Sequence, residues 1–211
     1  MYYLIKLRAP ELVLLFTTLM LLNSCRLPPP FAWRIVLDDD YSKPGIDYSL
    51  YKNLILLKFE AELLEDEIVE KITHLTAEEF KEKRYNIIKI QEINTLLEDS
   101  EFSIHDLWDS RVLRRIRNSL NIFAIIRGRV NRYWIETKIW ADPMTLPDPR
   151  LAEYQVINIC DISLTIEMID TQDWNIIWSS SISCKEGKIT GNTDRLVRRM
   201  IKECLKKIPK H

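Results

Sequence analysis

The chemistry within reach of this sequence rests first on its four cysteines, Cys25, Cys160, Cys184 and Cys204. A cysteine thiol can be acylated, oxidised to a disulfide or bound to a metal. No two of the four are spaced as C-x-x-C, so the sequence predicts neither a thioredoxin-like redox centre nor a zinc site. Acylation and a disulfide between distant cysteines are the chemistries that remain.

The histidines and charged residues indicate no catalytic site. His74, His105 and His211 have no second metal ligand at helical or loop spacing. No nucleophile elbow, zinc-protease helix, phosphate loop or dinucleotide fingerprint is present. The formal net charge of −1 shows that the chain as a whole lacks the excess of basic residues typical of nucleic-acid-binding proteins. We therefore predict a non-enzymatic protein without metal or cofactor; a catalyst assembled from residues far apart in the sequence is the alternative.

Cys25 directly follows a short apolar segment. Lys6 and Arg8 give the chain a basic start, and residues 12–22 form an apolar run. Eleven residues suit the hydrophobic region of a signal peptide, and they are too few to span a bilayer. The sequence therefore predicts export from the cytoplasm.

Leu22-Asn23-Ser24-Cys25 resembles the lipobox of bacterial lipoproteins, which has an aliphatic residue, two small residues and then cysteine. Asn23 departs from the usual small residue. The resemblance implies that signal peptidase recognises Leu22, Asn23 and Ser24, removes residues 1–24 and leaves a lipidated Cys25 that anchors the chain to a membrane. A plain secretory signal and a buried hydrophobic helix are the alternatives.

The residues after Cys25 suggest both a location and a tether. By resemblance to the enterobacterial sorting rule, Arg26 favours the outer membrane; the periplasmic face of the inner membrane and the cell surface are the alternatives. Three prolines follow at once, so we expect residues 25–50 to form an extended tether. Its Asp38-Asp39-Asp40 is expected to be solvated, and residues 51–211 are expected to form a single globular domain.

Hydrophobic periodicity in residues 51–211 predicts a mixed α/β (α+β) domain with the order β-α-β-α-β-β-β-α. A single sheet carries an amphipathic C-terminal helix packed on it. The expected strands are 53–60, 85–91, 122–140, 151–169 and 176–184. The expected helices are 66–84, 103–120 with Ser103 as N-cap, and 192–208, with a short helix or turn at 92–99.

Residues 122–140 and 151–169 alternate in polarity and flank a proline-rich loop, which predicts a long β-hairpin. Its arms far exceed the usual five or six residues of a strand. With the loop centred between the arms, Trp140 lies opposite Leu151. The far end of the hairpin is therefore expected to project past the rest of the sheet.

Cys160 and Cys184 are expected to face the core on paired strands. Cys160 shares its parity with apolar neighbours, and a turn centred on Gln172 would place the two cysteines opposite each other. A shift of one residue would move them to different faces. A disulfide is one interpretation in an oxidising envelope, and buried free thiols are the other.

The order of elements resembles the small domain shared by the curli-secretion channel lipoprotein, the penicillin-binding-protein activator lipoprotein and the TolB amino-terminal domain. The stretches that carry the resemblance are 53–60, 122–130 with Gly128, 168–171 leading into 176–179, and the closing helix. It implies an envelope lipoprotein that acts through protein partners. The chain departs from these families in three ways. Gln172-Asp173 replaces the glycine usual in the turn, and the tether is much shorter than the long disordered linker of the activator family. The chain also has one candidate long hairpin, where a barrel-forming channel subunit should provide two. Neither family's specific activity is therefore carried over.

Two surfaces are candidates for partner contact. The final helix exposes a basic face, and the hairpin carries aromatic residues of opposite parity, so at least one tryptophan should be exposed. The candidate residues are Arg195, Arg198, Arg199 and Lys202 on the helix, and Tyr133, Trp134 and Trp140 on the hairpin. A merely solvated helix face and aromatics packed under a loop are the alternatives.

Together these features predict a membrane-anchored envelope lipoprotein that serves as a protein-binding accessory of an envelope assembly. The alternative is an oligomeric secretion or pore component that uses the 122–169 hairpin as one element of a ring. A homo-oligomer fits either interpretation.

Overall fold

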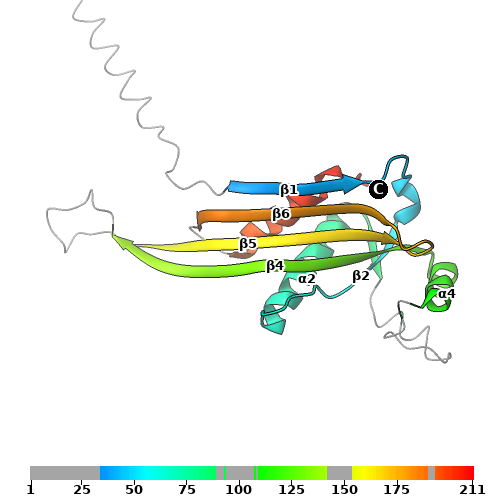
Figure 1. Cartoon of the computed structure of the whole chain (residues 1–211), viewed down its shortest axis with the longest axis horizontal. Helices are drawn as coiled ribbons and strands as arrows, with labels where there is room; N and C mark the ends of the chain where they lie inside the picture. The colour runs from blue at the N-terminus through cyan, green and yellow to red at the C-terminus, as the bar shows by residue number, and fades with distance from the viewer. Residues whose placement is uncertain (1–33, 89–92, 94–106, 108, 142–153, 190–192) are drawn as a thin grey trace, which may run out of the picture. The chain divides into compact units, whose positions relative to one another are not determined.

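A six-stranded sheet in the order β1-β6-β5-β4-β2-β3 forms the centre of the fold (Figure 1). The computed structural model describes residues 34–88, 93, 107, 109–141, 154–189 and 193–211. The strands are β1 (Arg34–Ser42), β2 (Asn53–Leu56), β3 (Asn86–Ile88), β4 (Ile122–Ala141), β5 (Tyr154–Asp170) and β6 (Ile176–Ile189). The neighbouring strands β1, β6, β5 and β4 are antiparallel to one another in turn, whereas β2 is parallel to both β3 and β4.

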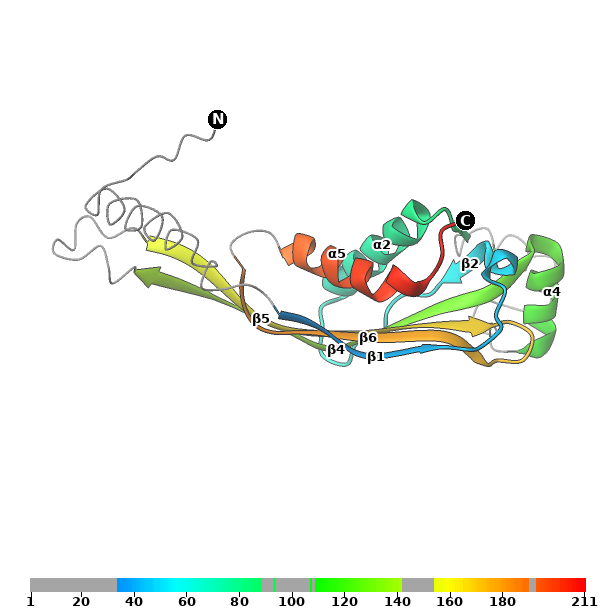
Figure 2. The same ribbon diagram turned by 90° about the horizontal axis from the view of Figure 1, so that it is seen from above.

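Helices cover both faces of the sheet. Helices α2 (Asp66–Glu82) and α5 (Thr193–Cys204) lie side by side on one face (Figure 2). Helix α4 (Ser110–Leu120) packs on the opposite face, where a smaller apolar cluster joins it to β2, β3 and the start of β4. Two 3-10 turns complete the described elements, η1 (Tyr48–Tyr51) and η4 (Leu205–Lys207), the latter continuing α5.

Each helix forms here because it buries one apolar stripe, and α4 also has a cap at both ends. In α4, the Asp109 carboxylate accepts a hydrogen bond from the Arg111 backbone N–H at 2.7 Å, and Asn121 ends the helix in the left-handed conformation. Each large aliphatic side chain removed from water stabilises the fold by roughly 1.5–3 kcal/mol. The buried stripes include Val69, Ile72, Leu75 and Phe80 of α2, and Leu196, Val197, Met200 and Ile201 of α5.

The predicted mixed α+β fold with one sheet and a packed C-terminal helix is confirmed. The tether expected through residue 50 is wrong for residues 34–50, which contain β1 and η1. The acidic run lies within β1 because its side chains have partners: Asp38 accepts a hydrogen bond from Ser183 Oγ at 2.9 Å, and Asp40 pairs with Lys207.

The long hairpin is also confirmed, with a different register. Trp140 pairs with Gln155 rather than with Leu151. Before the β-bulge at Asn131 the register is already three residues from the expected one, since Ile125 rather than Ile122 pairs with Ile169, and the bulge adds a fourth. The alternation of a sequence fixes neither the centre of the connecting loop nor a bulge. The expected loop between the arms lies outside the described residues.

The expected N-cap of the second helix is wrong, and the short helix expected at 92–99 stays a prediction. Helix α4 begins at Ser110 with Asp109 as N-cap, so Ser103 does not cap it. Ser103 itself lies outside the described residues, as does most of the short helix or turn expected at 92–99.

Candidate protein-binding site

The edge of β4 that faces away from β5 is covered for only part of its length. Beyond the last β2 pair, the Glu60 N–H donates to the Gly128 carbonyl at 2.9 Å, and the Glu60 carbonyl accepts from the Val130 N–H at 2.8 Å. The chain then leaves β4 for α2. Over residues 131–141, no strand within the described part of the chain pairs with this edge. Its backbone groups can therefore accept an added strand.

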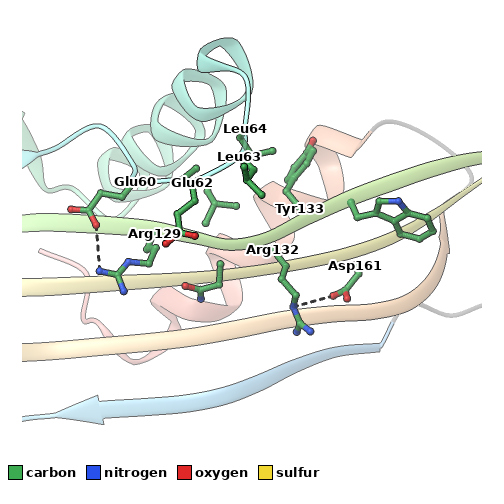
Figure 3. Close-up of a pocket in the computed structure, with 12 residues that line it drawn as sticks. Glu60, Glu62, Leu63, Leu64, Arg129, Arg132, Tyr133 and Asp161 are labelled. Atoms are coloured by element: carbon green, nitrogen blue, oxygen red, sulfur yellow. Dashed lines mark hydrogen bonds and ion pairs between the residues drawn. The ribbon is translucent and has the colours of Figure 1, made fainter.

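A groove of about 750 Å³ opens where the two segments part (Figure 3). Residues 60–64 form one side and residues 129–134 of β4 form the other, with Asp161 of β5 nearby. Leu63 is 96% exposed and Trp134 is 50% exposed. Apolar side chains of this size standing in solvent beside a groove are typical of a surface that binds another protein.

The alternation of β4 explains why Trp134 is exposed. Tyr133 points to the face covered by α2 and α5, where it is half-buried against the main core. Trp134 points to the opposite face, which α4 covers only at the start of β4. Burial is the main cause that raises the pKa of the Tyr133 hydroxyl, with the nearby Asp194 adding to the effect, so this group stays protonated. The exposure of a hairpin tryptophan agrees with the sequence-based expectation.

Two ion pairs line the groove, and both are accessible to water. Arg129 Nη2 lies 3.3 Å from Glu60 Oε2, and Arg132 Nε lies 3.6 Å from Asp161 Oδ1 (Figure 3). Exposed pairs of this kind contribute only about 0–1 kcal/mol. Arg129 can therefore exchange Glu60 for a carboxylate of a bound protein at little energetic cost. Arg132 pairs through Nε with the buried Asp161 Oδ1, and it can keep this pair while its terminal nitrogens bind such a carboxylate.

The basic face of α5 divides into two groups. Arg198 pairs with Glu78 and lies 3.2 Å from Glu79 Oε1, while Lys202 Nζ lies 3.2 Å from Glu82 Oε2, so these two cations join α5 to α2. Arg195 and Arg199 point outward and are exposed. Lys202 is exposed as well, although it pairs with α2, so three of the four candidates are accessible at the surface.

A second groove, of about 510 Å³, lies at the other edge of the sheet between β1 and α5. Ile35 and Leu37 of β1 line it together with Arg199 and Lys206. It lies far from Trp134 in the strand order, because β6 and β5 separate β1 from β4. The sequence gives no signal for this groove, because the acidic run of β1 resembles a tether. It gives none for Leu63, because no pattern shows that residues 60–64 return beside β4.

Cys160 and Cys184 are neighbours without being bonded. The register places Cys184 opposite Ile162, and a bulge places Cys160 opposite Gly187, so the cysteines are diagonal. Their Sγ atoms lie 3.9 Å apart, whereas a disulfide requires about 2.05 Å. The hydrogen bond to Cys160, followed by burial, raises the pKa of the Cys184 thiol, and burial raises that of Cys204 to about 12. These thiols are therefore protonated and unreactive at neutral pH.

The described residues contain no grouping of three or more His, Cys, Asp or Glu side chains that could hold a metal ion. His74 is exposed beside Glu78, and the His211 ring meets the Tyr85 ring edge-to-face, with centroids 4.4 Å apart. Within the same residues, no helix combines the length and apolarity needed to cross a bilayer. Cys25, Leu22, Asn23, Ser24, His105 and the side chain of Trp140 lie outside what the structure describes.

Comparison with known proteins relates this chain to others by fold alone. No family model matches it, and no curated protein matches it. The PelC dodecamer from Paraburkholderia phytofirmans superposes with a TM-score of 0.52 at 10% identity, over 82% of this chain and 95% of that one. A point variant of PelC gives 0.54 at 9% identity, over 85% and 100%.

Two lipoprotein structures are also similar, less closely. Lipoprotein GNA1162 from Neisseria meningitidis gives a TM-score of 0.45 at 14% identity, over 74% of this chain and 99% of that one. The LpoB C-terminal domain from Salmonella enterica gives 0.37 at 12% identity, over 64% and 84%. Of these four structures, the two of PelC exceed a TM-score of 0.5, and at 9–10% identity the likeness is one of fold.

Proposed function

We propose that this chain is a lipid-anchored accessory protein of the bacterial cell envelope that works by binding proteins, without catalysis. The observation that carries the proposal is the groove at the open edge of β4, with Trp134 and Leu63 in solvent. Main-chain groups along an open strand supply affinity for an extended partner segment, and flanking side chains supply selectivity.

The lipid anchor in this proposal rests on the resemblance of residues 22–25 to a lipobox. If Cys25 is acylated, β1 begins only nine residues later, at Arg34. Nine extended residues span at most about 30 Å. The domain would therefore work close to the membrane surface, and its partner would have to lie within the same short distance. The outer membrane is the proposed location.

Acylation is tested by labelled-palmitate incorporation into the wild type and Cys25→Ala, followed by membrane fractionation. The wild type should carry label and sediment with membranes, and Cys25→Ala should lose both properties. If Cys25→Ala still labels and still sediments, the anchor is wrong.

The binding site is tested by photo-cross-linking in cells. A photoreactive phenylalanine analogue replaces Trp134 in one strain and Leu50 in another. Leu50 is a matched control, since it is 58% exposed and lies on η1, away from the groove. Adducts with envelope proteins should form at position 134 and be absent at position 50. Equal labelling at both positions, or none at either, would contradict the proposal.

A second function has one observation in its favour. PelC, which shares the fold, is described as a dodecamer, so an oligomeric secretion or pore component built on the β4–β5 hairpin is the alternative. Mass photometry of the acylated protein in detergent decides it. Particles of several copies support this alternative, and monomers alone remove it.

A further inference from the structure

The sheet has two open edges at its end nearest the hairpin tip. There β4 pairs only with β5, and β1 pairs only with β6, among the residues that the structure describes. Among the described residues, seven large apolar side chains are exposed, and five of them lie along these two edges. They are Val36, Leu37 and Tyr41 on β1, and Leu63 and Trp134 beside β4. An exposed apolar strand edge favours pairing with another strand.

The charges of the two edges are complementary in the sheet layer. Asp38 and Asp39 are exposed on β1. Arg129 and Arg132 on β4 have side chains that are 59% and 48% exposed. An acidic edge strand on one copy therefore matches a basic edge strand on another.

The helix layer above the sheet is complementary in the opposite sense. The groove beside β1 carries three cations and two carboxylates, namely Arg199, Lys206, Lys207, Asp40 and Glu203. Lys206 Nζ lies 2.5 Å from Glu203 Oε2, and the Lys206 side chain is 69% exposed. Glu62, Glu65 and Glu67, where the chain passes from the β4 groove into α2, are exposed. Both layers would therefore bring opposite charges together if the β1 edge of one copy met the β4 edge of another.

The strand directions allow this pairing. Three antiparallel steps separate β1 from β4, so the two strands run in opposite directions. A neighbouring copy in the same orientation would thus extend the antiparallel part of the sheet. Different surfaces meet in such a contact, so it builds a ring or a filament of many copies and no twofold dimer. Every copy would also enter β1 at the same end, with its anchor toward one membrane.

We propose that copies of this chain associate head to tail, with the β1 edge of one copy added to the open β4 edge of the next. The proposal names a partner for the groove and so rests on the protein-binding function above. The same row across the sheet contains Val36, Ser183, Ser163 and Arg132, so Val36, Arg132 and Trp134 share a face. A register that places Val36 beside Trp134 also places Leu37 beside Tyr133. The irregularity of β1 at Asp38 then brings Asp39 beside Arg132. The added pairing ends at Asp40, because the next position, Val130, already donates to the Glu60 carbonyl.

Cysteine cross-linking of the full-length acylated protein in detergent tests this register. The Val36→Cys/Trp134→Cys double variant should give a ladder of dimers and larger species after mild oxidation. Each single variant should give no ladder. The control double variant Leu50→Cys/Trp134→Cys should give none either, because Leu50 lies on neither edge. A double variant that stays monomeric while keeping the wild-type circular dichroism spectrum would overturn the proposal.

Charge reversal provides a second measurement. Asp39→Arg and Arg132→Asp should each lower the oligomer fraction about tenfold, and the combined variant should restore it. Loss in all three variants would contradict the pairing. Envelope adducts at Trp134 from a protein that remains monomeric would refute self-association and leave the proposed function intact. Absence of both adducts and oligomers would refute the two together.

Discussion

The Phe59 ring lies directly over Gly128, so that a Cβ atom at position 128 would fall 2.2 Å from the ring carbon Cζ. No residue larger than glycine fits at position 128 unless Phe59 moves. Phe59 immediately precedes Glu60, which holds the start of the groove against β4. Packing therefore explains the glycine at position 128. By letting Phe59 approach β4, this glycine also helps to position Glu60 at the start of the groove.

Gly128→Ala should lower the free energy of unfolding by about 2–3 kcal/mol, because the added methyl group overpacks a filled core. Urea denaturation followed by circular dichroism measures the change. Combining Gly128→Ala with Phe59→Leu removes the far end of the ring and should recover part of the loss. Unchanged stability in the single variant would show that the close approach is wrong.

Tyr51 and Asp170 are a second pair joined across the chain. Tyr51 Oη donates to Asp170 Oδ2 at 2.7 Å in a buried position, so Tyr51→Phe should cost about 1–3 kcal/mol by leaving a carboxylate oxygen without this donor. Tyr48→Phe is the matched control, because its bond to Ser42 is equally short and exposed to water. Its cost should be well under half as large. Equal effects of the two substitutions would contradict the importance of burial.

Glu79 should make stability depend on pH. Burial is the main cause that raises its pKa, Glu82 adds to this, and Lys202 and Arg198 oppose it. The folded carboxyl group therefore keeps its proton to a higher pH than the unfolded one. Its stabilising contribution relative to Glu79→Gln is complete below the ordinary carboxyl pKa, and it is lost as pH rises through the folded pKa.

Unfolding midpoints of wild type and Glu79→Gln between about pH 4 and pH 8 check this sign. The advantage of the wild type should shrink with rising pH and then become constant. Growth of that advantage over the same range would mean that the pairs with Arg198 and Lys202 outweigh burial.

The buried cysteines should be slow to react. In the folded protein at about pH 8, a maleimide reagent should label Cys160, Cys184 and Cys204 at least about 100-fold more slowly than after unfolding. Unfolding without reductant also counts thiols in protein purified from the envelope. Three reactive thiols at these positions mean free cysteines, and one means that Cys160 and Cys184 have formed a disulfide. Rapid labelling of the folded protein would contradict their burial.

Periodicity predicted the helices and strands that bury a continuous stripe. Residues 66–84 and the final helix repeat apolar side chains at helical spacing, and β5 and β6 alternate, so local pattern and tertiary packing agree there. β1 has no such agreement. Three consecutive aspartates lie inside it, and their partners Ser183 and Lys207 are more than a hundred residues away. No local signal can report contacts at that separation.

The candidate site was predictable in part for the same reason. The parity of β4 predicted an exposed tryptophan, and Trp134 is exposed. The partner wall, residues 60–64, depends on how far β2 follows β4 before the chain turns away, which is a property of the assembled sheet. The pairs that Arg198 and Lys202 make with α2 have no sequence signal either, because the acidic side chains belong to another helix.

β1 gives the proposed anchor a mechanical meaning. A load between an acylated Cys25 and the domain would enter the fold at Arg34 and pull along the strand. β1 is paired to β6 from Arg34 to Ser42, so that load would shear the backbone hydrogen bonds of the whole strand together. Shear distributes force over many bonds, whereas a perpendicular pull would open them one at a time. The pairing of β1 with β6 would thus resist a force that pulls the domain away from its membrane anchor.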